Sequence, residues 1–572
     1  CYYKIMEKQN LSSLIWSTAD ELLRGDFKAS EYGRIILAFV VLRRLDCVIE
    51  PQKKKAFELY KKYKNKLSDI DLVIQKQLKL PFYNISKFDL TNLKDDPNNI
   101  LINFKNYING FSKNVFEIIE NFKILELVKE LNKNKSLYSI IDKFNEFNLH
   151  PNQIDNHKMG TIYEELLRKF SEMTNEESGD HFTPRDIVKL LVSLVFNPKK
   201  NNLKEKGIIK SVYDPCCGTG GMLTIGKEWI KENINNDLNI QLFGQERNPI
   251  TYAICKSDFL MSDENPENIK GPMTTLSQDQ YQDRKFDFML SNPPFGQSWK
   301  KEEDFIKDES KDVNGRFAGG LPRVSDGALL FLQHLIHKME PKSSRIGIIF
   351  NGSPLFTGDA GNGESEIRKW IIEKDLLETI VMLPDKLFFN TAITTYIWIL
   401  DNKKDNQRKG KVQLIDAREF YKFEKVKYGA KSKRVSDEQT LEILKNYHNF
   451  EENKKSKIFD NDYFKYTKVT IDQYLKDKSG NILKDKKGNP KIDKQKREFE
   501  RIPFSQNIEE YLLTEVKPHL SEFSYNKEFN KIGYEISLTK EFYDFSDFRS
   551  AEEVKKDFNI LNSEILDLEK NL

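Results

Sequence analysis

The stretch Phe286–Phe295, with the sequence FDFMLSNPPF, is a strand-like apolar run that ends in two consecutive prolines. Because neither Pro293 nor Pro294 has a backbone N–H to donate, the run cannot continue a sheet ladder and must end in a stiff turn. Open α/β sheets place their ligand sites at this carboxyl end of the strands. The amide oxygen of Asn292 and the carbonyl of Pro293 can accept hydrogen bonds from an –NH2 group, and Phe295 can stack on the ring that carries it. The turn suits a planar conjugated amine; the alternative is an ordinary rigid turn with a core Phe.

Strands and helices alternate around this stretch, from about Gly160 to about Glu419. Such alternation is typical of a largely parallel sheet with helices on both faces. The predicted helices include residues 222–234, 328–339 and 364–374. The predicted strands are residues 211–213, 240–244, 286–290, 346–350, 377–382, 396–400 and 412–415.

The composition of the chain changes on both sides of this α/β region. Residues up to about Asn156 have apolar side chains at helical spacing, and the chain becomes polar after Glu419. We predict a helical domain over residues 1–158, a catalytic domain over residues 159–425 and a C-terminal region over residues 426–572. The last stretch, 550–572, has a helical stripe that can pack on its own chain or on a partner helix. That stripe is Val554, Phe558, Leu561, Ile565 and Leu568.

A glycine-rich turn follows the first predicted strand. Residues 214–221, Asp-Pro-Cys-Cys-Gly-Thr-Gly-Gly, open a helix, and their glycines let a ligand approach the backbone at the positive helix N-terminus. Glu246 ends the next strand, where an acid commonly binds both hydroxyls of a ribose. The loop and the acid together imply an adenosine-type cofactor.

Three cofactor sites compete for this loop. A dinucleotide site needs a third glycine where Leu223 stands, and a phosphate-binding loop needs a hydroxyl where Glu228 stands, inside the predicted helix. S-adenosylmethionine needs no pyrophosphate cradle and tolerates an acid such as Asp214 near its cationic end. A plain strand–helix turn is the alternative without a ligand.

Charge and cysteine content exclude some classes of protein. The 572 residues include 91 basic and 88 acidic side chains, a net charge of +3, so any nucleic-acid contact must come from a local patch or a partner. The five cysteines form no metal-binding cluster, and we interpret them as reduced thiols of a cytoplasmic protein. No apolar run reaches a membrane-spanning length, and we expect no membrane partner.

A third element, Gly179–Arg185 with the sequence GDHFTPR, precedes the glycine loop. Taken alone, it is also typical of a helix start, with Thr183 as N-cap and Pro184 at the first position. The three elements in this order resemble the modification (M) subunit of type I restriction–modification systems, an adenine-specific DNA methyltransferase. Further segments are similar to that family: residues 11–16, 42–46, 383–391, 415–418, 515–516 and 533–536.

The resemblance implies a Rossmann-like S-adenosylmethionine-dependent methyltransferase core with an N-terminal all-helical domain and a C-terminal helical extension. It implies methyl transfer to the N6 amine of adenine, flipped out of double-stranded DNA, with no metal. The implied catalytic residues are Asn292, Pro293, Pro294 and Phe295. The implied cofactor-binding residues are Asp180, His181, Phe182, Thr183, Pro184, Arg185, Asp214, Gly218, Thr219, Gly220, Gly221 and Glu246.

Two departures from the family pattern concern the cofactor pocket. His181 stands where the family usually has Tyr. Gly271–Leu276 lacks an Asp that the family often places near the cofactor adenine, and Ser277 or Asp279 are the candidates to replace it.

Sequence recognition is expected to come from another chain, because no separate domain is rich in both aromatic and basic residues. The resemblance implies a specificity (S) subunit clasped by two M chains, the C-terminal helix as its contact, and a restriction (R) subunit in the full complex. Lys431, Lys433 and Arg434 are candidate phosphate contacts, and a solvated charged loop is the alternative.

Two other functions are compatible with the same turn. One is methylation of another planar amine, such as a protein glutamine or an RNA guanine. The other is a non-catalytic DNA-binding scaffold of a defence complex. A methyl-transfer assay on DNA and on protein separates these possibilities.

Overall fold

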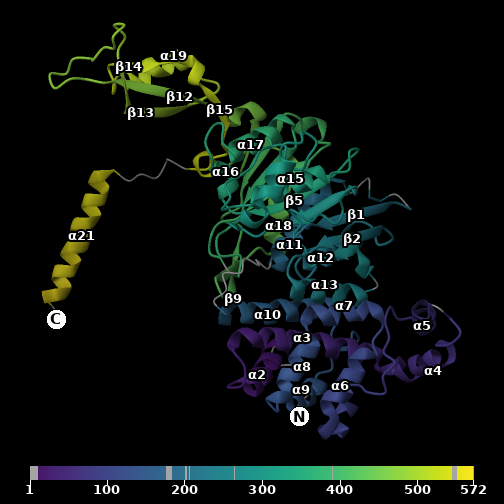
Figure 1. Cartoon of the computed structure of the whole chain (residues 1–572). Coiled ribbons are helices and arrows are strands. Elements are labelled where there is room, and N and C mark those ends of the chain that lie inside the picture. Colours follow the sequence, from purple (N-terminus) through teal and green to yellow (C-terminus); the bar gives the residue numbers. More distant parts are fainter. Residues whose placement is uncertain are drawn as a thin grey trace.

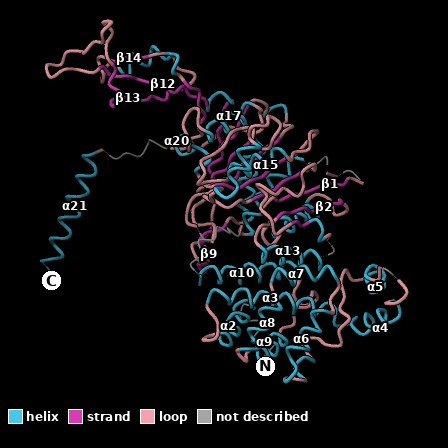
Figure 2. Tube along the Cα trace, in the orientation of Figure 1, coloured by secondary structure: helices cyan, strands magenta, loops and turns pink. Residues whose placement is uncertain are grey.

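Helices form the N-terminal part of the chain in the computed structural model, which describes residues 11–67, 69–174, 183–199, 203–204, 207–262, 264–389, 391–543 and 550–570 (Figures 1 and 2). The centre of this part is α3, in which every residue from Ile35 to Leu42 is fully buried. The last helix of this part, α10, packs on α2 and α3. The helical part therefore extends beyond residue 158, which we predicted as the end of the domain. The helices are α2 (Leu11–Leu23), α3 (Ala29–Ile49), α4 (Lys53–Tyr63), α5 (Asp71–Leu78), α6 (Ile100–Asn109), α7 (Lys113–Phe122), α8 (Ile124–Lys133), α9 (Leu137–Glu146) and α10 (Asn156–Thr174).

One large mixed sheet occupies the middle of the chain. Within the described residues it has nine strands, in the order β11-β8-β6-β7-β5-β4-β1-β2-β3. β7 runs antiparallel to β5 and β6, and β11 runs antiparallel to β8, whereas the other neighbours are parallel. The predicted α/β fold is confirmed, and each predicted strand overlaps a strand of this sheet. The strands are β1 (Ile209–Asp214), β2 (Asn239–Gln245), β3 (Ile269–Lys270), β4 (Phe288–Ser291), β5 (Arg345–Phe350), β6 (Leu377–Met382), β7 (Tyr396–Asp401), β8 (Lys411–Asp416) and β11 (Ser456–Asp460).

Helices cover both faces of this sheet (Figure 1). The side chains of α11, α12 and α18 share one core cluster with the strands, and those of α15 and α17 share another. Every residue of β5, β6 and β7 is buried, as a sheet covered on both faces requires. The helices of this part are α11 (Arg185–Phe196), α12 (Gly221–Asn233), α13 (Pro249–Met261), α14 (Glu303–Glu309), α15 (Ala328–His337), α16 (Ser353–Phe356), α17 (Gly363–Glu373) and α18 (Asp437–Asn449).

The C-terminal part contains a smaller sheet that the sequence analysis did not predict. β12 (Lys465–Tyr474) pairs antiparallel with β13 (Ile492–Pro503), β14 (Phe523–Tyr525) and β15 (Lys531–Tyr534). The large sheet also includes residues beyond 425, our predicted boundary, because β11 (Ser456–Asp460) pairs with β8. The remaining elements are β9 (Lys422–Tyr428), β10 (Lys431–Arg434), α19 (Ile508–Tyr511), α20 (Leu538–Glu541) and α21 (Ala551–Lys570).

The last of these, α21, matches the predicted final helix and stands apart from the rest of the described chain (Figure 1). Four residues of its apolar stripe, Val554, Phe558, Leu561 and Ile565, are exposed: Phe558 is 63% exposed and Leu561 is 56% exposed. Among the described helices, none has both the length and the apolar character that a bilayer crossing requires.

A buried arginine joins the middle strands of the large sheet. Arg345, at the start of β5, donates hydrogen bonds to Glu378 Oε2 of β6 at 2.8 Å and to Asp401 Oδ2 of β7 at 2.5 Å. Its Nη2 also donates to the hydroxyl of Tyr447 of α18 at 3.1 Å. Burial alone would raise the pKa of Glu378, but Arg345 and Arg408 outweigh it and lower that pKa to about 2. The carboxylate is therefore charged and depends on its arginine partners.

Replacing Arg345 with Met should destabilise the fold by about 3 kcal/mol or more, because two buried carboxylates lose a cationic partner. Among the ion pairs of the described residues, Glu378 would keep only Arg408 at 3.8 Å, and Asp401 would keep only Lys199 at 2.9 Å. Urea unfolding monitored by circular dichroism measures the loss. The pKa of Glu378 is lower in the folded protein than in the unfolded chain. The difference in free energy of unfolding between wild type and variant should therefore be present above the unfolded-state pKa of Glu378 and should shrink as the pH falls toward 2.

Lys300→Met, which removes a surface ion pair with Glu303, is the control and should leave the unfolding midpoint nearly unchanged. Equal midpoints for both variants would contradict this account.

Candidate active site

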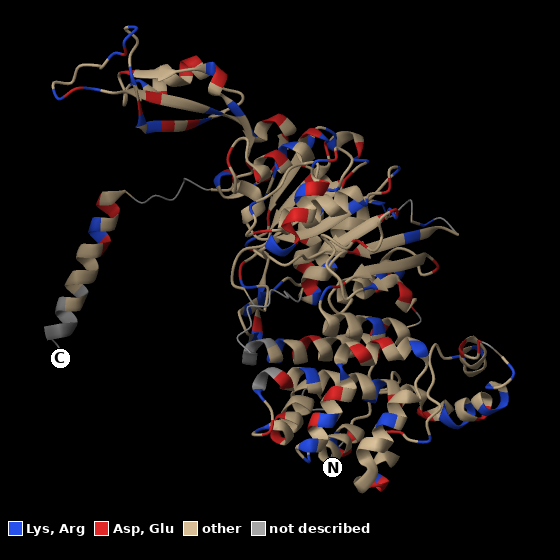
Figure 3. Cartoon of the chain, in the orientation of Figure 1, with Lys and Arg blue, Asp and Glu red and all other residues tan. Residues whose placement is uncertain are grey.

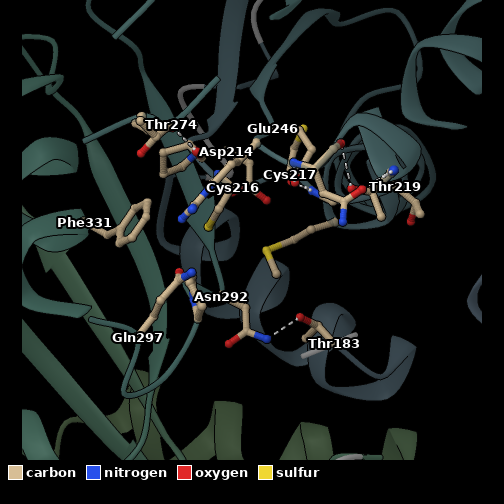
Figure 4. A pocket seen from close by; sticks show the side chains of 18 of the residues that line it. Thr183, Asp214, Cys216, Cys217, Thr219, Glu246, Thr274, Asn292, Gln297 and Phe331 are labelled. Atoms are coloured by element: carbon tan, nitrogen blue, oxygen red, sulfur yellow. Dashed lines mark hydrogen bonds between the residues drawn. The ribbon is translucent and has the colours of Figure 1, made fainter. Parts of the chain in front are cut away.

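A cavity of about 430 Å³ opens at the carboxyl ends of β1, β2 and β4 (Figure 4). This volume lies within the range of small-molecule sites. β1 leads into the glycine loop, β2 into Glu246 and β4 into the turn at Asn292. The predicted site residues that line the cavity are Thr183, Asp214, Gly218, Thr219, Gly221, Glu246, Asn292 and Pro294.

The other predicted site residues lie elsewhere. Pro293 is buried, and Phe295 is half-buried against the core cluster that contains α11 and α12. Arg185 lines an adjoining cavity of about 200 Å³. Neither Pro184 nor Gly220 is part of the lining of the larger cavity. The residues Asp180, His181 and Phe182 lie outside the described part of the chain.

The glycine loop turns sharply between β1 and α12. Gly218 and Gly220 have φ angles of +54° and +83°, a region that glycine adopts without strain. Gly220 is the N-cap of α12, and a Cβ there would lie 2.7 Å from Cys255 Sγ of α13. The loop thus needs glycine both for its backbone conformation and for close packing on α13.

Glu246 ties the glycine loop to the end of β2. The backbone N–H of Gly218 donates to Glu246 Oε2 at 2.8 Å, and that of Asn248 donates to Oε1 at 2.7 Å. Asn248 in turn caps α13, because its side chain accepts from the N–H of Ile250 at 2.8 Å. Glu246 is 8% exposed, and main-chain N–H donors hold its carboxylate at the cavity wall.

Asp214 is a buried acid at the end of β1. It is 2% exposed and accepts a hydrogen bond from the backbone N–H of Cys216 at 3.0 Å. Burial raises the pKa of Asp214 to about 7, and the nearby charge of Glu246 acts in the same direction. A cationic ligand in this cavity would supply the counter-charge that this carboxylate lacks.

Asn292 contacts the segment before α11. Its Nδ2 donates to Thr183 Oγ1 at 2.9 Å, which joins the turn after β4 to the start of that helix (Figure 4). The helix begins at Arg185 with Pro184 as its N-cap, so the prediction that Thr183 is the N-cap is wrong by one residue. Since the amide nitrogen points to Thr183, the carbonyl oxygen is the end of the amide offered to an amine.

Several lining residues were not predicted from the sequence. Trp299 and Phe331 add aromatic surface, and Glu164 of α10 adds an acid. Phe331 belongs to the mainly apolar helix α15, and Glu164 belongs to an amphipathic helix, so neither stands out from its neighbours in sequence.

The two candidates for the missing acid near the adenine are not part of the cavity. Asp279 forms an ion pair with Lys338, and its Oδ1 accepts from the N–H of Tyr281 at 2.9 Å. Neither Asp279 nor Ser277 lines the cavity, whereas Thr274, Thr275 and Leu276 do.

The basic residues after Gly429 are engaged within the chain. Lys431 is 5% exposed and lies 3.4 Å from Asp186, and Lys433 pairs with Asp385. Lys431 is therefore neither a solvated loop residue nor an available phosphate contact.

Two family models match the chain. The model described as N-6 DNA Methylase matches residues 154–479, which include the glycine loop, Glu246 and Asn292. The model described as HsdM N-terminal domain matches residues 11–144.

Curated relatives and a solved structure agree with these models. The chain is 28% identical over 428 residues to the type I restriction enzyme MjaIX methylase subunit of Methanocaldococcus jannaschii, covering 71% of this chain and 72% of that protein. It is 33% identical over 262 residues to the HindI methylase subunit of Haemophilus influenzae, covering 46% of this chain and 54% of that protein. The crystal structure of a type I restriction-modification system methyltransferase subunit from Streptococcus thermophilus is 22% identical, with a TM-score of 0.60, covering 80% of this chain and 96% of that one. This last likeness establishes a shared fold.

Replacing Gly220 with Ala should weaken binding of S-adenosylmethionine, because a positive φ costs Ala about 1–2 kcal/mol and its Cβ would meet Cys255. Isothermal titration calorimetry measures the affinity. Gly25→Ala is the matched control: Gly25 has a φ of +94° and open space around the added Cβ, far from the cavity in sequence. Unchanged affinity in the Gly220 variant would show that the loop tolerates the side chain and would contradict this reading of the turn.

Proposed function

The chain belongs to the N-6 DNA methylase family, and from this premise we propose that it transfers a methyl group from S-adenosylmethionine to the N6 amine of adenine in DNA. The observation that carries the proposal is the shared cavity of the glycine loop, Glu246 and the turn at Asn292. Two acids of this cavity match the parts of the cofactor: Glu246 suits the ribose hydroxyls, and Asp214 suits the cationic end. S-adenosylmethionine supplies the activated methyl group when it is bound.

The turn after β4 is proposed to hold the adenine amine. The amine of adenine is a poor nucleophile because its lone pair is delocalised into the ring. The Asn292 carbonyl oxygen and the Pro293 carbonyl accept hydrogen bonds from the two N–H groups of this amine. These hydrogen bonds localise electron density on the amine nitrogen. Holding this amine beside the cofactor provides much of the rate acceleration over the reaction in solution, through proximity and orientation. The base must leave the duplex to reach the cavity.

Aromatic side chains are proposed to stack on the flipped base. Phe295 remains the residue predicted for this role from the sequence, and it is half-buried beside the turn. Phe331 and Trp299 bring aromatic surface into the cavity itself. Stacking on aromatic side chains contributes about 1–3 kcal/mol per base in proteins that bind single strands.

Replacing Asn292 with Ala should lower methyl transfer to DNA by about 100-fold or more, as the loss of one transition-state hydrogen-bonding group does elsewhere. Binding of S-adenosylmethionine should persist, since Glu246 and the glycine loop are unchanged. A tritium-transfer assay on DNA and a binding titration measure the two effects.

Asn351→Ala is the matched control for Asn292→Ala. Asn351 follows the neighbouring strand β5 and accepts from the N–H of Ser353 at 3.2 Å, but it does not line the cavity. Its variant should keep most of the transfer activity. Normal methylation by the Asn292 variant would refute the proposed role of the turn.

The choice of DNA site is proposed to lie in a specificity subunit, with two copies of this chain for each such subunit and a restriction subunit in the full complex. Figure 3 supports this division, since basic and acidic residues are interspersed along the described elements. The exposed apolar stripe of α21 is proposed as the contact with the specificity subunit. We place the complex in the cytoplasm, where its DNA substrate lies.

Replacing Phe558 with Asp should abolish co-purification with the specificity subunit, because a charge would enter the apolar stripe of the helix. Phe558 is already 63% exposed, so the fold and cofactor binding should be unaffected. Ser563→Asp, which adds the same charge outside the stripe, should leave co-purification intact. Pull-down from a strain that expresses both subunits measures the effect, and equal recovery of the two variants would exclude α21 as the contact.

A further inference from the structure

Glu164 is the one acid of the larger cavity that comes from the N-terminal helical part of the described chain. It belongs to α10 and lines both the larger cavity and the adjoining one of about 200 Å³. Its side chain is only 16% exposed. A Cβ on Gly221, the first residue of α12, would lie 3.2 Å from Glu164 Oε1. The carboxylate therefore rests against the point where the glycine loop becomes a helix.

Within the part of the chain that the structure describes, Glu164 has one ion-pair partner. Arg185 Nε lies 3.7 Å from Glu164 Oε2. Arg185 is also used elsewhere, because its Nη2 donates to the backbone carbonyl of His157 at 2.9 Å. Burial raises the pKa of Glu164 to about 7, although Arg185 acts in the opposite direction.

The cavity wall has two parts, which can contact different ends of a ligand. Glu246 and Asn248 stand at the end of β2, and the wall beyond them continues with Thr274–Leu276. Glu164 of α10 lies beside Gly221, the first residue of α12, and Asp214 of β1 adds a buried acid to this wall. If the ribose lies at Glu246, the other end of the cofactor lies toward Gly221 and Glu164.

We propose that Glu164 binds the ammonium group at the amino-acid end of S-adenosylmethionine. This inference rests on the proposed function. The cofactor carries a sulfonium and an ammonium, and the cavity offers separate acids for them, Asp214 for the sulfonium side and Glu164 for the ammonium. A hydrogen bond between an ammonium and a carboxylate is stronger than a neutral one, so a neutral side chain at this position should bind the cofactor less tightly.

Arg185 acts through Glu164 in this arrangement. Arg185 was expected from the sequence to contact the cofactor, but it lines the adjoining cavity and lies at ion-pair distance from Glu164. At this distance Arg185 is a positioning residue for the Glu164 carboxylate, which lines both cavities.

The test compares two ligands on two proteins by titration calorimetry. The ligands are S-adenosylhomocysteine and its deamino analogue, in which hydrogen replaces the ammonium group. Glu164→Gln should weaken binding of S-adenosylhomocysteine by about 10- to 100-fold, the effect of one charge-assisted hydrogen bond. The same substitution should change binding of the deamino analogue by no more than about threefold, because that ligand has no group for the carboxylate.

The control is Glu228→Gln, which removes an acid that lines only the adjoining cavity. This variant should bind both ligands as the wild type does. Equal weakening of both ligands by Glu164→Gln would assign Glu164 a structural role and overturn the inference, and so would no weakening of either. If the wild-type chain, with its specificity subunit present, binds neither S-adenosylmethionine nor S-adenosylhomocysteine, the proposed function itself fails. Thermal unfolding of Glu164→Gln confirms that the variant is folded.

Discussion

The parallel pairing of β1 with β4 is the constraint on which the site depends. Val212 pairs with Phe288 and Tyr213 with Met289, so both strands end at the same edge of the sheet. The chain leaves β1 toward β2 on one side and returns to β4 on the other, which makes this the switch point of the sheet. The glycine loop and the turn at Asn292 are therefore neighbours by topology, and Cys216 Sγ lies 3.1 Å from Ser291 Oγ between them.

The electrostatics of the cavity follow from this crowding of strand ends. Asp214 is buried and Glu164 is half-buried, and the pKa values of both carboxyls are raised to about 7, which favours their protonated forms. Among the described lining residues, Arg247 is the only basic one. Ionising both acids in an empty cavity is therefore costly. Under the proposed function, a sulfonium ligand would recover the cost of burying these acids.

The parts of the site that the sequence predicts are the parts with local patterns. The glycine loop and the turn at Asn292 each follow a short apolar strand, and each signal lies within about ten residues. Glu164 and Phe331 reach the cavity through helix packing, which no local pattern encodes. β13 was missed because its residues are mostly charged and exposed, so it has no apolar alternation. Lys431 was placed on a loop because burial of a lysine beside Asp186 depends on a segment 245 residues away.

The helical part and the catalytic part are joined too closely to act as independent units. α13 contributes Ala253, Ile254 and Leu260 to the helical core, and Tyr252, Cys255 and Phe259 to the core of the sheet. Cys255 is also the side chain that packs on Gly220, so a shift of α13 relative to the sheet would reach the cofactor loop directly. On the helical side, Lys256 pairs with Glu117 of α7. A movement of the helical part, such as one that accompanies assembly with DNA or a partner, would thus reach the cavity through α13 and through α10, whose Glu164 lines it.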